Sequence, residues 1–157
     1  MTSYHILVPL DLGEYADHVL NDVLTFVGAL NTRTEPLQTH VTLLHVIEMP
    51  NLPGIPEHIV LDLIRQPEAW ARRTLEETYA ARVRESGVAC NTIVISGVPS
   101  QVIVETARSR KVNMIMMGTH GHSGIPHMML GSVADKVLRL APCPVMVVRP
   151  PGQEETS

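Results

Sequence analysis

The chain alternates short apolar runs with longer segments in which apolar residues recur every three or four positions. Residues 4–10 form an apolar run without helical period and rich in strand-forming side chains, which predicts a buried strand. The next segment, 14–30, has the spacing of a helix with one apolar stripe. That stripe consists of Ala16, Val19, Leu20, Val23, Leu24 and Val27.

The same alternation continues to the end of the chain. It predicts further strands at residues 40–47, 91–96, 112–118 and 144–149, and further helices at 57–85, 100–110 and 132–140. Pro67 predicts a break in the long second helix, and Gly87 predicts its C-terminal cap. Residues 31–39 and the proline-rich segment 48–56 are expected to be irregular.

The predicted strands are almost continuously apolar, which is typical of a parallel sheet covered by helices on both faces. We therefore expect a single α/β domain over residues 1–150. Its predicted architecture is a doubly wound, Rossmann-like, five-stranded parallel sheet with strand order 3-2-1-4-5. The polar tail 151–157 is expected to be disordered.

Composition narrows the class of partner. With 12 Lys plus Arg against 16 Asp plus Glu, 3% aromatic residues and no basic cluster, nucleic acid is not expected as a partner. No apolar run approaches the roughly 18 residues of a membrane span, and the first residues do not resemble a signal peptide. Cys90 and Cys143 fit no metal or redox spacing, so we expect buried free thiols in a cytoplasmic protein.

Ligands of doubly wound sheets bind outside the carboxyl ends of the strands. Two predicted strand ends carry unusual residues: Pro9, Leu10 and Asp11 follow the first, and a glycine-rich segment follows the fourth. The glycine-rich segment has the skeleton Gly118-x2-Gly121-x9-Gly131-Ser132. Glycines allow a backbone to approach a ligand closely, and the helix that opens at Ser132 offers free N–H groups, its dipole and a hydroxyl. The pattern predicts an anion site suited to a polyphosphate.

Other interpretations of this segment remain open. Its glycines are also what a long strand-to-helix turn requires. The segment is not a P-loop, because no Gly-x4-Gly-Lys-Ser/Thr is present, and no Gly-x-Gly-x2-Gly follows the first strand. His120, His122 and His127 could bind a metal, contact phosphates or face water, and their spacing matches no known metal site.

On these residues the chain resembles the universal stress proteins, and in particular their ATP-binding branch, whose signature is Gly-x2-Gly-x9-Gly-Ser/Thr. The resemblance runs from about Tyr4 to Arg149. It includes the Val-Pro-x-Asp end of the first strand, the Leu-His-Val-Ile-Glu of the second and the closing Cys-Pro-Val-x-Val-Val.

The resemblance implies a role for each matching position. Asp11 would contact the adenosine, although it could instead cap the following helix. Pro9 and Leu10 would line the adenine side, and the Val46 backbone would recognise the adenine edge. Met117 and Gly118 would lie beside the ribose and first phosphate, and the remaining phosphate contacts would come from Gly121, Gly131, Ser132 and Val133. The family's turn near the ribose matches Gly97-Val98-Pro99, for which a plain turn capped by Ser100 is the alternative.

The expected ligand is ATP, with ADP or AMP as alternatives and with Mg²⁺ held mainly by the phosphates. Where many relatives have Asp-x-Ser, this chain has Asp11-Leu12-Gly13 and lacks that hydroxyl. The phosphate loop contains no Lys or Arg; the nearest following cations are Lys136 and Arg139. Efficient phosphoryl transfer needs such charges, so no catalytic residue is assigned.

We therefore expect a nucleotide-responsive sensor or switch that signals through a protein partner of unknown identity. The alternatives are a slow ATPase or phosphotransferase and a dimeric interaction module that binds no nucleotide. The resemblance also implies a homodimer paired through the last strand, from Val145 to Arg149, which would otherwise expose an edge. Trp70 is either packed or an interface anchor.

Overall fold

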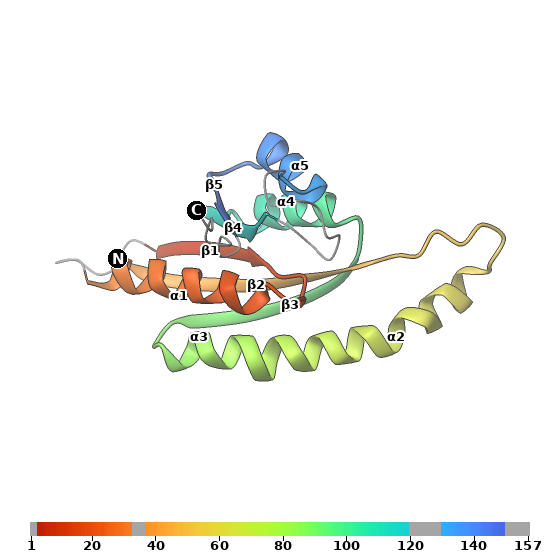
Figure 1. The fold of residues 1–157 in the computed structure, drawn as a ribbon, viewed down its shortest axis with the longest axis horizontal. Helices are drawn as coiled ribbons and strands as arrows, with labels where there is room; N and C mark the ends of the chain where they lie inside the picture. Colours follow the sequence, from red (N-terminus) through yellow and green to blue (C-terminus); the bar gives the residue numbers. More distant parts are fainter. Residues whose placement is uncertain (1–2, 33–36, 120–129, 150–157) are drawn as a thin grey trace, which may run out of the picture.

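The fold is a five-stranded parallel sheet between two layers of helices (Figure 1). The computed structural model describes residues 3–32, 37–119 and 130–149. The strands are β1 (Ser3–Pro9), β2 (Gln38–Glu48), β3 (Ala89–Gly97), β4 (Met114–Gly118) and β5 (Val145–Val148). Their order is β3-β2-β1-β4-β5 and every pairing is parallel, which confirms the predicted fold class and strand order.

The helices cover both faces of the sheet. They are α1 (Ala16–Asn31), α2 (Glu57–Thr74), η1 (Leu75–Ala80) and α3 (Ala81–Glu85) on one face, and α4 (Pro99–Ser109) and α5 (Ser132–Leu140) on the other (Figure 1). In β1, Ile6 and Val8 belong to the core beneath α1, and Leu7 belongs to the core beneath α4. All three are fully buried. This explains why the strand has no polar alternation. Among the described residues, no helix is long and apolar enough to span a membrane.

The prediction of a helix break near Pro67 is wrong, because α2 continues through this residue to Thr74. Proline lacks the N–H that would bond the carbonyl four residues earlier, which belongs to Leu63. Leu63 is 56% exposed, so water can satisfy that carbonyl. The loss is therefore small on the outer part of the helix, and Pro67 is tolerated.

The departure from α-helical geometry comes later, in the π-helical segment η1. Its last turn is closed by the Ala81 N–H, which bonds the carbonyl of Glu76 five residues earlier. The Glu76 carboxylate pairs with Arg84 and accepts a hydrogen bond from Thr92 Oγ1 at 2.9 Å. The bond from Arg84 is the main reason that the pKa of Glu76 lies below its usual value. The pair ties η1 to α3, and the Thr92 bond ties it to β3.

Helices α3 and α4 end in the same hydrogen-bonded motif. After α3, Gly87 N–H bonds the Arg84 carbonyl at 2.9 Å and Val88 N–H bonds the Val83 carbonyl at 3.4 Å. This is the Schellman pattern, and Gly87 has the positive φ, +83°, that the pattern requires. The predicted helix end at Gly87 is therefore confirmed.

The corresponding residue after α4 is Lys111, with φ of +50°. The Lys111 and Val112 N–H groups bond the carbonyls of Arg108 and Ala107 at 3.2 and 3.1 Å. Because Val112 completes this turn, β4 begins at Met114 rather than at the predicted residue 112.

His5 links β1 to both of its neighbours near the amino edge of the sheet. The His5 N–H donates to Asn113 Oδ1 at 2.7 Å, and Asn113 N–H returns a bond to the His5 carbonyl at 2.8 Å. The imidazole Nε2 lies 2.8 Å from Thr42 Oγ1, and the ring stacks on His40 with 4.6 Å between centroids. Burial lowers the pKa of His5, and His40 and Arg110 lower it further. His5 is therefore held as a neutral imidazole.

The cysteines are free thiols, as predicted. Cys90 is buried in β3, and burial raises its pKa to about 11, whereas Cys143 is only half-buried. Since the thiolate is the reactive form, Cys90 is an inert core side chain.

The two Schellman turns give substitutions of opposite sign. Lys111→Gly should raise the free energy of unfolding by about 0.5–1 kcal/mol, because a non-glycine residue at positive φ carries that order of strain. Gly87→Ala should lower it by about 1 kcal/mol, although an added Cβ meets no atom within 4 Å. Urea denaturation measures both; equal signs for the two variants would contradict the assignment.

The His5 environment predicts acid lability. The folded pKa lies below the unfolded value of 6.5, so the unfolded chain binds more protons as the pH falls past that value. The stabilisation is complete above the unfolded pKa and is lost as the pH falls through the folded pKa, with a slope between them of at most about 1.4 kcal/mol per pH unit. Across this pH range, the denaturation midpoint of His5→Gln should lack the pH dependence that His5 causes. The midpoint of His58→Gln, which alters an exposed histidine, should keep it.

Candidate functional site

The carboxyl edge of the sheet opens between β1 and β4. β1 pairs with β2 as far as Pro9 and Leu44, but its pairing with β4 ends at Leu7 and Ile115. The chain runs from β1 outward to β2 and β3 on one side and to β4 and β5 on the other. This is the point where the strand order reverses, and ligands of doubly wound sheets bind at such points.

The end of β1 is fixed by two bonds from β2. Leu10 N–H donates to the Leu44 carbonyl at 2.8 Å, and His45 Nδ1 lies 2.7 Å from the Leu10 carbonyl. Because a carbonyl only accepts, Nδ1 carries the proton in this bond. Leu10 is 4% exposed, and Val46 beside His45 is half-buried. His45 is therefore a positioning residue that sequence reasoning missed, although it lies next to the predicted Val46.

Asp11 follows directly and is half-buried. Its Oδ1 accepts the Gly13 N–H at 2.9 Å, and Oδ2 has no partner among the described residues. Helix α1 starts five residues later with Tyr15 at its N-cap and no side-chain capping bond, so the interpretation of Asp11 as a helix cap is wrong. Between Asp11 and Gly13, Leu12 has φ of +59°, a conformation that costs a leucine about 1–2 kcal/mol. The turn is strained and leaves one carboxylate oxygen available.

The start of α5 faces the same edge. Gly131 is its N-cap, with φ −61° and ψ 155°, and no side chain caps the helix. The Gly131 N–H already donates to the Thr119 carbonyl at 2.8 Å, and its carbonyl accepts Asp135 N–H at 2.9 Å. Within the described part of the chain, the Ser132 and Val133 N–H groups are left without acceptors. Unsatisfied N–H groups and the helix dipole make this end compatible with an anion.

Some of the remaining predicted site residues lie in the described part of the chain and others do not. Met117 is buried and Gly118 half-buried at the end of β4, where Gly118 pairs with Val148. Gly121 and the histidines His120, His122 and His127 lie outside the described residues. Within the residues that are described, no group of three His, Cys, Asp or Glu side chains could hold a metal ion.

The turn at the end of β3 brings the Gly97 backbone close to a side chain of α4. Gly97 has φ of +156°, and a Cβ there would lie 2.9 Å from Val102 Cγ2. Helix α4 then begins at Pro99 with Val98 as its N-cap and no side-chain capping bond. The interpretation of Ser100 as a helix cap is therefore wrong, and Ser100 is instead buried at 5% exposure.

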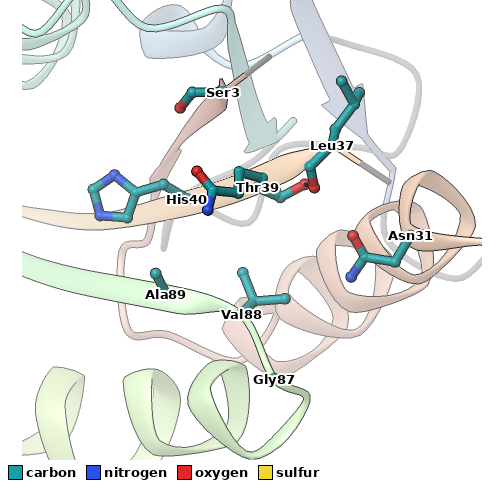
Figure 2. Close-up of a pocket in the computed structure, with 9 residues that line it drawn as sticks. Ser3, Asn31, Leu37, Thr39, His40, Gly87, Val88 and Ala89 are labelled. Carbon is teal, nitrogen blue, oxygen red and sulfur yellow. Dashed lines mark hydrogen bonds between the residues drawn. The ribbon is translucent and has the colours of Figure 1, made fainter. Parts of the chain in front are cut away.

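A pocket of about 460 Å³ lies at the opposite, amino edge of the sheet (Figure 2). It is lined by Ser3, Asn31, Leu37, Gln38, Thr39, His40, Gly87, Val88 and Ala89. Helix α1 ends at Asn31, and α3 ends just before Gly87. The C-terminal ends of helices carry partial negative charge, so they disfavour a phosphate. The pocket is therefore a poorer anion site than the carboxyl edge.

Comparison with known proteins agrees with the fold. The model of the universal stress protein family matches residues 3–149. The chain is 32% identical over 130 residues to universal stress protein MJ0531 of Methanocaldococcus jannaschii, covering 80% of this chain and 74% of that protein. The solved structure of MJ0577 superposes with a TM-score of 0.81 at 27% identity, over 98% of this chain and 100% of that one.

Two solved structures with lower sequence identity are complexes with an adenine nucleotide. One is a universal stress protein from Arabidopsis thaliana with AMP bound, with a TM-score of 0.64 and 20% identity over 98% of this chain and 95% of that one. The other is a universal stress protein in complex with cAMP, with a TM-score of 0.64 and 19% identity, over 95% and 98% of the two chains.

The fold and the carboxyl edge together define a Rossmann-like α/β protein whose strand-reversal point has an uncapped helix end beside it. The family match covers nearly all of the described residues. The chain belongs to the universal stress protein family.

Proposed function

We propose that this chain binds an adenine nucleotide at its carboxyl edge and acts as a nucleotide-responsive switch. The observation that carries the proposal is the uncapped start of α5 beside the gap between β1 and β4. The Ser132 and Val133 N–H groups, which have no acceptor among the described residues, and the exposed Ser132 side chain fit a phosphate chain. Gly118 and Gly121 would bring the β4 end close to the same phosphates.

The adenosine half would lie over the end of β1. Asp11 Oδ2, which has no partner in the described part of the chain, can accept a hydrogen bond from a ribose hydroxyl. Pro9, Leu10 and the Val46 backbone would contact the adenine, and Met117 the ribose. His45 holds Leu10 in place and so positions Asp11 indirectly.

ATP is the proposed ligand because the Gly118-x2-Gly121-x9-Gly131-Ser132 spacing offers contacts to more than one phosphate. The AMP and cAMP complexes of related folds support an adenine nucleotide. Mg²⁺ would be held mainly by the phosphates, neutralising their charge. ADP and AMP are the alternatives that the experiments below separate.

Charge at the start of α5 favours holding the nucleotide over cleaving it. Arg139 is engaged by Asp135 at 3.1 Å, and Lys136 is exposed one turn into the helix. Transfer of a phosphoryl group needs cations on the transferring phosphate. A change of bound nucleotide would instead alter the carboxyl-edge surface offered to a protein partner. We also propose that β5, an edge strand with Met146 37% exposed, pairs with a second copy.

Mg-ATP should stabilise the fold. At about one hundred times Kd, binding adds about 2.7 kcal/mol to the free energy of unfolding, or roughly 5–10 °C in Tm for a domain of this size. Differential scanning fluorimetry with Mg-ATP, Mg-ADP and AMP measures the shift. The absence of any shift at millimolar nucleotide would refute the binding proposal and favour an interaction module.

Two substitutions divide the site into its halves. Ser132→Ala should weaken ATP binding by about tenfold, because a hydrogen bond to a charged group is lost, and should affect AMP less. Asp11→Ala should weaken both nucleotides alike. Isothermal titration calorimetry measures the affinities, with Ser3→Ala and Asp22→Ala as controls at exposed positions outside the proposed site. Equal losses for ATP and AMP in Ser132→Ala would place the phosphates elsewhere.

Phosphate release distinguishes the switch from the slow enzyme. We expect no more than trace release from Mg-ATP in a single-turnover assay at saturating protein. Metal-dependent release above a trace rate in this assay would favour the ATPase alternative, even if both substitutions behave as expected.

A further inference from the structure

Helix α2 has a second apolar stripe that the fold does not bury. Its inner stripe consists of the buried residues Val60, Ile64 and Ala71 and continues into Leu75, and α2 packs against β2 and β3. Ile59, Leu63 and Trp70 follow spacings of four and seven residues, so they also share one face of the helix. They are 43%, 56% and 56% exposed. We call this set the outer stripe.

Further exposed apolar side chains lie close to the outer stripe in the sequence. The connection leading into α2 exposes Met49, Leu52 and Ile55 as well. In Figure 1 this connection and the first part of α2 extend well away from the sheet. A tryptophan and two aliphatic side chains aligned on one helix face are typical of an interface anchor, and singly scattered apolar residues are not.

The charges beside the outer stripe define its partner. Asp62 and Arg73 lie on the same flank of the stripe, about three helical turns apart. Arg72, by contrast, is engaged by Glu68 at 2.7 Å and by the Val94 carbonyl at 3.2 Å. Among the described residues, Asp62 forms an ion pair with Arg65 at 3.3 Å, with the two side chains 64% and 80% exposed, and Arg73 has no ion-pair partner.

A second copy of α2, placed antiparallel on the first, satisfies these charges. A two-fold axis perpendicular to both helices keeps each flank on its own side, so Asp62 of each copy meets Arg73 of the other. The axis then passes near Pro67, and Trp70 of one copy comes level with the helix between Leu63 and Gln66 of the other. The antiparallel arrangement also pairs the helix dipoles favourably.

The inner stripe faces neither the partner helix nor the Asp62 flank. It lies roughly a third of a turn around the helix from the outer stripe, on the side away from the Asp62 flank. The sheet that it packs against therefore does not lie between the two helices. We infer that the outer stripe of α2 is an isologous interface between two copies of this chain, centred on Trp70 and specified by reciprocal Asp62–Arg73 pairs.

The single tryptophan of the chain makes the interface directly measurable. On dilution from millimolar to nanomolar protein, Trp70 emission should shift to longer wavelength as light-scattering mass falls. Leu63→Glu should weaken this association by about tenfold or more. Leu138→Glu, at a similarly exposed site on the other face of the sheet, should leave the Trp70 transition unchanged.

A charge exchange tests the antiparallel register. Asp62→Arg should weaken association, and the double variant Asp62→Arg with Arg73→Asp should restore it towards the original affinity. Circular dichroism confirms that the variants fold. Trp70 emission that stays unchanged at every concentration, or a double variant no better than Asp62→Arg alone, would overturn the proposal. A change in mass without a shift of Trp70 emission, which pairing through β5 alone would give, would also overturn the proposal.

Discussion

The structure depends on burying both faces of β1. Ile6 and Val8 point into one core and Leu7 into the other, and none of the three is accessible to water. A strand of this kind must lie in the middle of a sheet, with helices on each side. That central position places the reversal of strand order directly beside β1. The candidate site therefore follows from the same apolar run that forms the core.

The local patterns that govern burial were readable from the sequence. The apolar runs located all five strands, and Gly87 marked a helix end because its role depends only on neighbouring backbone groups. The prediction at Pro67 was wrong because the cost of a proline inside a helix depends on whether water reaches the carbonyl at Leu63, which is a tertiary property. The π-helical geometry of η1 could not be read either, since Glu76 bonds Arg84 and Thr92 across three different elements.

The candidate site was predictable in its backbone and less so in its side chains. Asp11 and the start of α5 at Ser132 fall where the sequence placed them, on the ends of β1 and α5. What Asp11 bonds to was not accessible from sequence, because the capping alternative has the same residue type at nearly the same spacing. His45 was missed for a related reason: a histidine in an apolar strand shows its partner only when the neighbouring strand is in register.

Segment η1 also changes which side chains of the helical arm face the sheet. A π turn takes up more residues than an α turn, so it changes the phase of every side chain that follows. Ala71 before the change and Val83 after it are both buried, so each part of the helical arm is in phase with the sheet on its own. The π-helical segment η1 accommodates an offset of about one residue between the two parts of the arm. Relatives with a chain one residue shorter here could therefore keep the same core with an uninterrupted α-helix. The packing of this helix on the sheet would be unchanged.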